Sequence, residues 1–263
     1  MRPASCVLAL FFFTGCLTVR NTPIQERIRA AEKLFGAQQP LKWSETLEGV
    51  ETRIPVSGKQ AVLTLDACGS DGDGYDRELI DFLREQQIPA SLFINARWIR
   101  KNPRIFEDLA RDPLFTIENH GTEHRPASVN GRSAYGIRGT RSASELAQEV
   151  LENALEIEHL TGRRPLFYRS GTAYYDEIAV RLIHSLGFRI AGFDILGDRG
   201  ASYSAAEVEE ALLGTRPGSL IILHMNHPES GTAEGVRRAL PQLKKAGFSF
   251  VNLEGLPPKA DGH

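Results

Sequence analysis

The sequence is poor in cysteine, which limits how the folded protein can be stabilised. Only three of its 263 residues are cysteines. Cys6 and Cys16 belong to the N-terminal segment, so Cys68 is the only cysteine in the body of the chain. No intramolecular disulfide can form there, even in an oxidising compartment. Stability must therefore come from a hydrophobic core.

The sequence also lacks an excess of basic residues. Lys and Arg number 31 against 33 Asp and Glu, which gives a formal net charge of −2. Because nucleic-acid-binding proteins usually carry a basic excess, nucleic acid is not an expected partner. With 41% hydrophobic and 24% charged residues, the composition is that of a globular protein with one sizeable core.

An apolar run, Val7 to Phe13, follows Arg2 and is too short to span a bilayer as a mature helix. We interpret residues 1–15 as an export signal. Thr14-Gly15-Cys16 resembles the lipobox of bacterial lipoproteins, although Phe13 stands where that pattern prefers an aliphatic residue. We favour lipidation at Cys16 over an unmodified N-terminus. The prediction is an exported protein of the cell envelope whose tie to the membrane is a lipid at Cys16.

The next segment, residues 16–57, is predicted to be an N-terminal extension and connector. Asn21 to Pro40 contains apolar residues at helical spacing and is predicted to form a short amphipathic helix. Lys42 to Ser57 has no clear periodicity and is predicted to be a connector.

Apolar runs of strand length then alternate with helical patterns over residues 58–256, and residues 257–263 form a tail. The seven predicted strands are Ala61–Leu65, Ala90–Ile94, Leu114–Ile117, Leu166–Tyr168, Phe188–Phe193, Leu220–Leu223 and Phe248–Leu253. Strands that are apolar nearly throughout and alternate with helices favour a parallel sheet covered by helices.

Glycine-rich phosphate-binding motifs are absent after the first predicted strand. Gly69, Gly72 and Gly74 fit neither G-x-G-x-x-G nor a P-loop. An open doubly wound sheet is the competing architecture. We predict an α/β fold, a distorted (β/α) barrel with about seven parallel strands.

Polar residues follow the first six predicted strands. They are Asp66, Asn95, the pair His120 and His124, Arg169, Asp194 and His224. In barrels of this kind the carboxyl ends of the strands converge on one mouth. Two histidines at a spacing of four can share a divalent ion such as zinc. Together with carboxylates, an arginine and a further histidine, they favour metal-assisted hydrolysis.

These residues resemble a known family. Thr64-Leu65-Asp66, Asn119 to Pro126, Phe167-Tyr168-Arg169, Asp194, and Gly218 to His224 are similar to the five ordered motifs of the NodB-homology polysaccharide deacetylases. The resemblance runs from about Ala61 to Leu256. The fold of that family, a distorted (β/α) barrel, agrees with the strand count above.

The resemblance implies a metal-dependent hydrolase that removes N-acetyl groups from an envelope or extracellular polysaccharide. It assigns His120 and His124 to a divalent metal, with zinc expected, and Asp66 to the general base. His224 matches the general acid, a role suited to an imidazole. Arg169 would orient Asp66, and Asp194 would hold His224 in the needed tautomer.

The sequence departs from the family in the first motif. A second aspartate normally follows the base and completes the metal triad, whereas Ala67-Cys68-Gly69 follow Asp66 here. The third ligand could be Asp66 itself, Cys68, or an acidic residue at Asp71 or Asp73, and we favour Asp66. Ser170 to Tyr174 replace the proline-containing turn that follows the arginine in the family.

Two other functions stay open. The incomplete first motif supports a non-catalytic envelope lipoprotein that binds glycans. The same site could also hydrolyse a different amide or an O-acetyl ester. Trp98 could stack on a sugar or pack in the core, and we expect surface or packing roles for His159, His184 and His227. The sequence predicts no oligomeric state.

Overall fold

The computed structural model describes residues 23–255 of the chain. The predicted signal, the predicted lipidation site at Cys16 and the tail lie outside these residues. None of the helices in residues 23–255 has both the length and the apolar character needed to cross a bilayer.

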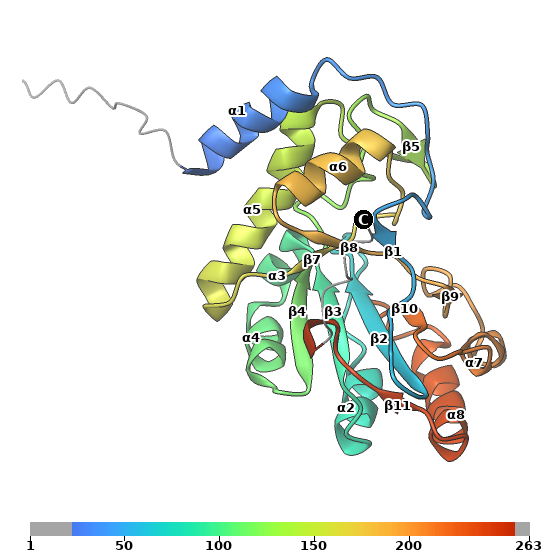
Figure 1. Ribbon diagram of the computed structural model, residues 1–263. Helices are drawn as coiled ribbons and strands as arrows, with labels where there is room; N and C mark the ends of the chain where they lie inside the picture. Colours follow the sequence, from blue (N-terminus) through green and yellow to red (C-terminus); the bar gives the residue numbers. More distant parts are fainter. Residues whose placement is uncertain (1–22, 256–263) are drawn as a thin grey trace, which may run out of the picture.

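The centre of the molecule is one parallel sheet (Figure 1). Its spatial order is β1-β8-β7-β4-β3-β2-β10-β9, and β11 pairs with β2 off this path. Every pairing in this sheet is parallel. The strands are β1 (Val50–Glu51), β2 (Gln60–Ala67), β3 (Ala90–Ile94), β4 (Phe115–Asn119), β7 (Phe167–Tyr168), β8 (Arg189–Ala191), β9 (Ile195–Leu196), β10 (Leu220–His224) and β11 (Ser249–Phe250).

The sheet curls so that its two ends approach each other. The chain just after β1 forms an antiparallel bridge between Arg53 and Ser219, at the start of β10. There the Ile54 N–H donates to the Gly218 carbonyl at 2.9 Å. The predicted distorted (β/α) barrel is therefore confirmed, and all seven predicted strands are present.

Three short features were not predicted. Strand β1 lies in the segment that we expected to be a connector, and β9 lies directly after Asp194. A two-stranded antiparallel hairpin, β5 (Ser133–Ala134) and β6 (Ile137–Arg138), rises from the loop between β4 and the next helix. Each of these strands has only two residues, too few to show a period in the sequence.

The helices cover the outside of the sheet (Figure 1). In chain order they are α1 (Pro23–Phe35), α2 (Arg77–Glu85), α3 (Ala96–Lys101), α4 (Pro103–Arg111), α5 (Ala143–Thr161), α6 (Glu177–Ser185), α7 (Ala205–Leu213) and α8 (Thr232–Lys245), with a final 3₁₀ turn, η1 (Leu253–Gly255). The predicted N-terminal helix is α1, whose Ala31 is buried in the same core cluster as residues of α5 and α6.

Local signals fix the limits of α5, the longest helix. The Ser142 hydroxyl accepts a hydrogen bond from the Glu145 N–H at 3.1 Å, which caps the start of the helix. The reciprocal contact of a capping box does not form there, because the Glu145 carboxylate accepts from the Arg141 N–H. Gly162 ends the helix at φ 72°, a left-handed conformation that suits glycine.

Candidate active site

The carboxyl ends of the central strands bring several of the predicted residues to one cavity. Asp66 of β2 and His224 of β10 are directly paired in the parallel register. With Cys68 and His124 they line a cavity of about 740 Å³. The remaining wall includes Tyr135 and other residues from four further segments of the chain.

Asp66 is buried and held by an arginine. The guanidinium of Arg169 donates from Nη1 to Asp66 Oδ1 at 2.6 Å. Its other nitrogens donate to the Ala191 and Gly192 carbonyls at 3.1 and 3.0 Å, and its plane lies over the ring of Phe93. These contacts hold the guanidinium in one orientation. Because the guanidinium in turn holds Asp66 Oδ1, the direction of the other carboxylate oxygen, Oδ2, is also fixed.

The two histidines of the third predicted strand end face each other. Their ring centroids are 4.9 Å apart. His120 Nδ1 lies 3.0 Å from the Arg169 carbonyl oxygen. A carbonyl can only accept, so Nδ1 carries the proton and Nε2 keeps its lone pair for another partner.

Cys68 completes a trio with these histidines. Ligand atoms of Cys68, His120 and His124 all lie within 4.8 Å of one another, and no other trio of this kind occurs in residues 23–255. His120 Nε2 is 3.8 Å from the Cys68 sulfur. The structure thus places Cys68, rather than the favoured Asp66, with the imidazole pair. Asp66 Oδ2 approaches His120 Nε2 at 3.6 Å but is outside the trio.

The trio has the donor chemistry of a metal site. His124 Nε2 is buried and has no hydrogen-bond partner, which is costly unless something binds it. Imidazole nitrogen and thiolate sulfur are ligands that suit zinc. Burial raises the pKa of the Cys68 thiol, but the nearby His124 and His120 imidazoles outweigh this and bring that pKa well below its ordinary value. The ligand types of this trio and the distances between their ligand atoms therefore fit a divalent ion.

His124 sits on a strained and closely packed backbone. Its φ is 60°, in the left-handed region that a histidine rarely adopts. Gly171 packs directly against it, because a Cβ atom at Gly171 would lie 2.2 Å from the His124 carbonyl oxygen. The departure from the family turn after Arg169 thus has a local reason, since this loop must approach the His124 backbone closely.

A buried polar network holds the rest of the histidine loop. The Asn95 amide donates to the carbonyls of His120 and Gly121 at 3.0 and 2.7 Å. Asn119 accepts from the Gly121 N–H at 2.9 Å. From α5, the Glu149 carboxylate accepts the N–H of Glu123. Asn95 therefore holds the backbone of the histidine loop in position.

His224 is paired with Asp198, and not with Asp194. His224 Nδ1 lies 2.8 Å from Asp198 Oδ1, and the His224 N–H donates to the other oxygen at 2.6 Å. Burial lowers the pKa of His224, but the negative Asp198 overcomes this and raises that pKa well above its ordinary value. The imidazole is thereby stabilised in its protonated form.

The predicted placement of Asp194 was wrong. Asp194 precedes β9, and its N–H donates to the Leu220 carbonyl at the start of β10, whereas His224 lies at the far end of that strand. The Asp194 carboxylate instead accepts from Ser219 at 3.0 Å and pairs with Arg53 and Arg216. The signal that could have identified Asp198 is its place as a polar residue shortly after a strand. That strand, β9, is too short to be recognised in the sequence.

The other singled-out residues have structural roles. Trp98 is fully buried and its indole N–H donates to the Gly74 carbonyl at 2.9 Å, so it cannot reach a sugar. Asp73 accepts from the Ser70 N–H at 2.7 Å and approaches His227 at 3.5 Å, away from the trio. His227 lines the cavity rim, which we did not predict.

Comparison with known proteins identifies the family of the chain. The sequence profile described as polysaccharide deacetylase matches residues 53–191, more than half of the chain. The chain belongs to the polysaccharide deacetylase family. The predicted family resemblance is confirmed.

Individual relatives of this polysaccharide deacetylase family member are distant. A peptidoglycan-N-acetylglucosamine deacetylase of Bacillus cereus is 23% identical over 211 residues, which cover 79% of this chain and 92% of the relative. A CE4 family pseudoenzyme from Bacillus anthracis superimposes with a TM-score of 0.65 at 18% identity, over 78% of this chain and 67% of the other. A family 4 acetyl xylan esterase from Clostridium thermocellum, solved with a cobalt ion, gives 0.62 at 22% identity, over 76% and 93%. These structures share the fold.

Proposed function

We propose that this polysaccharide deacetylase family member is an active metal-dependent hydrolase that removes N-acetyl groups from an envelope or extracellular polysaccharide. One observation carries the proposal. The Cys68, His120 and His124 trio lies at the same cavity as a fixed carboxylate, Asp66, and an imidazole, His224, whose pKa is raised by Asp198. The name of the Bacillus cereus relative supports an N-acetylated glycan such as peptidoglycan.

Cys68, His120 and His124 would hold the metal. When bound, a divalent ion supplies a Lewis acid that polarises the acetamide carbonyl and makes water more acidic. A soft thiolate beside two imidazoles favours zinc over magnesium or calcium, which prefer oxygen ligands.

The remaining residues move protons. The free Asp66 oxygen takes a proton from the attacking water while Arg169 holds the carboxylate. His224 then donates its proton to the sugar nitrogen as the C–N bond breaks, and acetate and a free amine leave. Asp198 accepts the Nδ1 proton of His224 and stabilises the imidazolium, so the proton that His224 donates is the one on Nε2.

The cavity rim provides a surface for the glycan. Tyr135 is 74% exposed and lines the cavity. Its ring packs edge-on against Tyr174, which in turn contacts Trp43, with centroid distances of 5.6 Å for both pairs. Such a supported aromatic ring can stack on a sugar. Export and a lipid at Cys16 would place this site in the cell envelope.

The proposal is tested by acetate release. Purified protein is incubated with peptidoglycan and with poly-N-acetylglucosamine, before and after metal removal by a chelator, and alongside His120→Ala. We expect acetate only from the metal-loaded wild type. Activity that survives both metal removal and His120→Ala would show that the mechanism is wrong.

A second candidate is a non-catalytic glycan-binding lipoprotein. It is favoured by Ala67, which stands where the family carries its second aspartate, and a structural neighbour is named a pseudoenzyme. Glycan binding that is insensitive to metal, with no acetate after long incubation, would support it. The remaining alternative, hydrolysis of a different amide or an O-acetyl ester, is tested by assaying a panel of such compounds.

A further inference from the structure

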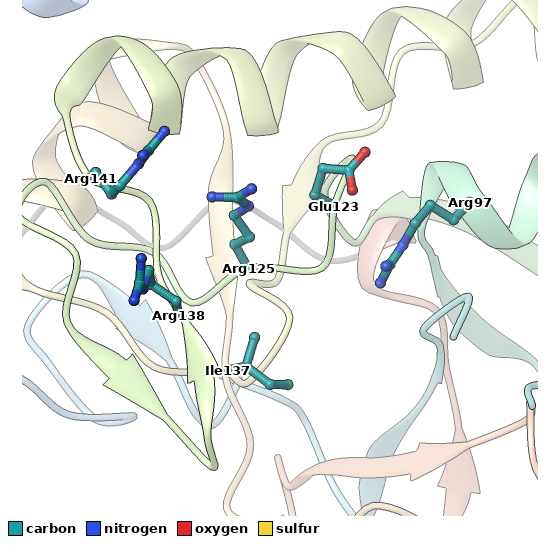
Figure 2. A pocket seen from close by; sticks show the side chains of 6 residues that line it. All are labelled: Arg97, Glu123, Arg125, Ile137, Arg138 and Arg141. Carbon is teal, nitrogen blue, oxygen red and sulfur yellow. The ribbon is translucent and has the colours of Figure 1, made fainter. Parts of the chain in front are cut away.

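A second hollow, of about 410 Å³, opens beside the active-site cavity and is lined by four arginines. Its wall consists of Arg97, Glu123, Arg125, Ile137, Arg138 and Arg141 (Figure 2). Ile137 also lines the active-site cavity, so the two spaces share a wall. The arginines come from different elements. Arg97 lies on α3, Arg125 in the loop after β4, Arg138 on β6, and Arg141 directly before the N-cap residue of α5.

The hollow is joined to the metal trio through the chain. Arg125 directly follows His124. Gly69, which directly follows Cys68, lies so close to α3 that a Cβ there would be 2.9 Å from the Arg97 Cβ. A glycan whose acetamide reaches the trio can therefore extend a neighbouring group toward the arginines.

The positive charge of this hollow is only partly neutralised. Glu145 pairs with Arg125 at 2.6 Å and with Arg141 at 3.0 Å. Arg97 and Arg138 have no ion-pair partner among residues 24–254. In Figure 2, Arg138 and Arg141 lie on one side of Arg125, and Glu123 and Arg97 on the other.

This clustering is not a by-product of composition. The whole protein carries a net charge of −2, yet four guanidinium groups gather here against the carboxylates of Glu123 and Glu145. Like charges held together raise the free energy of the folded state unless an anion joins them. Guanidinium groups bind carboxylate and phosphate with paired hydrogen bonds.

We propose that this arginine hollow is a subsite for an anionic substituent, a carboxylate or a phosphate, carried by the glycan next to the acetamide that is hydrolysed. The inference rests on the proposed deacetylase function and names its substrate class, an acidic N-acetylated glycan. The hairpin formed by β5 and β6 supplies both Arg138 to the subsite and Tyr135 to the cavity rim, so it selects the substrate.

Three probes test the subsite. The first is a glycan strand of alternating N-acetylglucosamine and N-acetylmuramic acid with free carboxylates, the second is the same strand as its methyl ester, and the third is an N-acetylglucosamine oligomer bearing phosphate on its sugars. Binding is measured by calorimetry with the full-length, metal-loaded protein in the Asp66→Asn background, which blocks turnover. Acetate release by the wild type is measured in parallel.

The two charged strands should bind more tightly than the ester, and the tighter of the two identifies the anion. Arg138→Gln and Arg97→Gln should each weaken binding of a charged strand about five- to tenfold, because a charge-assisted contact at a partly exposed site is lost. Binding of the ester should not change. Glu123→Gln should tighten binding of the charged strands, since it removes an opposing carboxylate.

The control is Arg104→Gln on α4, which removes the same charge from an exposed position outside the hollow. Equal binding of all three strands, or an Arg104→Gln effect as large as that of Arg138→Gln, would overturn the subsite. A preference for charged strands without any acetate release would support the subsite and refute the deacetylase proposal alone, so the two can fail separately.

Discussion

The Nδ1 atom of His224 lies 2.8 Å from the Oδ1 atom of Asp198, and both side chains are held inside the protein. Asp198 also accepts from the His224 N–H and from the Thr232 hydroxyl at 3.0 Å. One carboxylate thus fixes both the backbone and the ring of the proposed general acid. Asp66 and His224 lie opposite each other on the adjacent strands β2 and β10, and each has a partner of its own, Arg169 for the proposed base and Asp198 for the proposed acid.

Asp198→Asn should lower kcat for amide hydrolysis by on the order of 10- to 100-fold, the size of the loss seen when a metal-bound imidazole loses the partner that orients it. The loss should be much smaller for 4-nitrophenyl acetate, whose leaving group needs no protonation. Thermal unfolding and bound metal are measured to exclude a folding defect. Asp194→Asn is the matched control and should leave kcat close to that of the wild type. Equal losses in both variants would contradict the assignment.

Cys68→Ala should reduce metal affinity by on the order of 100-fold or more, because even the loss of an outer partner of a metal ligand costs roughly 10- to 100-fold. Asp66→Asn should keep the metal and lose activity. Metal content is measured by elemental analysis. Cobalt-substituted wild type should also show a thiolate-to-metal charge-transfer absorption, and this band should vanish in Cys68→Ala. Full metal binding without that band in the wild type would remove Cys68 from the ligand set.

Gly171→Ala should weaken metal binding and destabilise the fold by about 1–3 kcal/mol, the usual cost of overpacking. The added Cβ would meet the His124 carbonyl oxygen at 2.2 Å and must displace that backbone. Gly72→Ala is the control, because a Cβ there meets nothing within 4 Å. Chemical unfolding and metal titration report both effects. Wild-type metal affinity in Gly171→Ala would show that the loop does not position His124.

Tyr135→Ala should raise KM for a glycan roughly three- to tenfold and leave kcat nearly unchanged, since a stacked aromatic ring contributes about 0.5–1.5 kcal/mol. Tyr135→Phe loses the hydrogen bond from the hydroxyl to Glu45. Because it keeps the ring, it should behave like the wild type. Steady-state kinetics on an N-acetylglucosamine oligomer measures the split. A fall in kcat alone would argue against a binding role.

The stability of the protein should depend on the ionisation of Asp176, which caps α6. Burial raises the pKa of its carboxyl above the ordinary 3.8, although N–H donors from Ala179 and Val129 oppose this shift. Between the ordinary and the raised pKa only the folded state holds the proton, so the free energy of unfolding falls as pH rises through that window. Asn also caps helices, and Asp176→Asn removes the titration.

Urea unfolding of both proteins at a series of pH values, from about 3 to 7, tests this linkage. The difference in unfolding free energy, Asp176→Asn minus wild type, should increase with pH through the window and then level off. A difference that stays flat or decreases would contradict the raised pKa.

Most of the fold could be predicted because its main signals are local. The strands β2, β3 and β10 are apolar nearly throughout because both faces of each are buried. β1, β9 and the β5–β6 hairpin could not be predicted, since each short strand forms only where a partner from another part of the chain provides its hydrogen bonds.

The residues of the site could be predicted from the sequence, whereas their hydrogen-bond partners could be predicted only in part. A residue at the end of a strand can be found from the sequence. Asp66, His124 and His224 were found in this way and line one cavity, and His120 lies against Asp66 and His124. Their partners depend on which strands lie side by side. Parallel pairing of β9 with β10 brings Asp198 to His224 and leaves Asp194 at the other end of β10.

By itself, the sequence determined the class of fold, the family and the reactive side chains, because periodicity and motif order are properties of the chain alone. The tertiary structure decided that Cys68 joins the two histidines, that Asp198 serves His224, and that four arginines from separate segments border one hollow. Each of these is a contact between residues distant in the chain, and only the packing of the sheet and its loops fixes such distances.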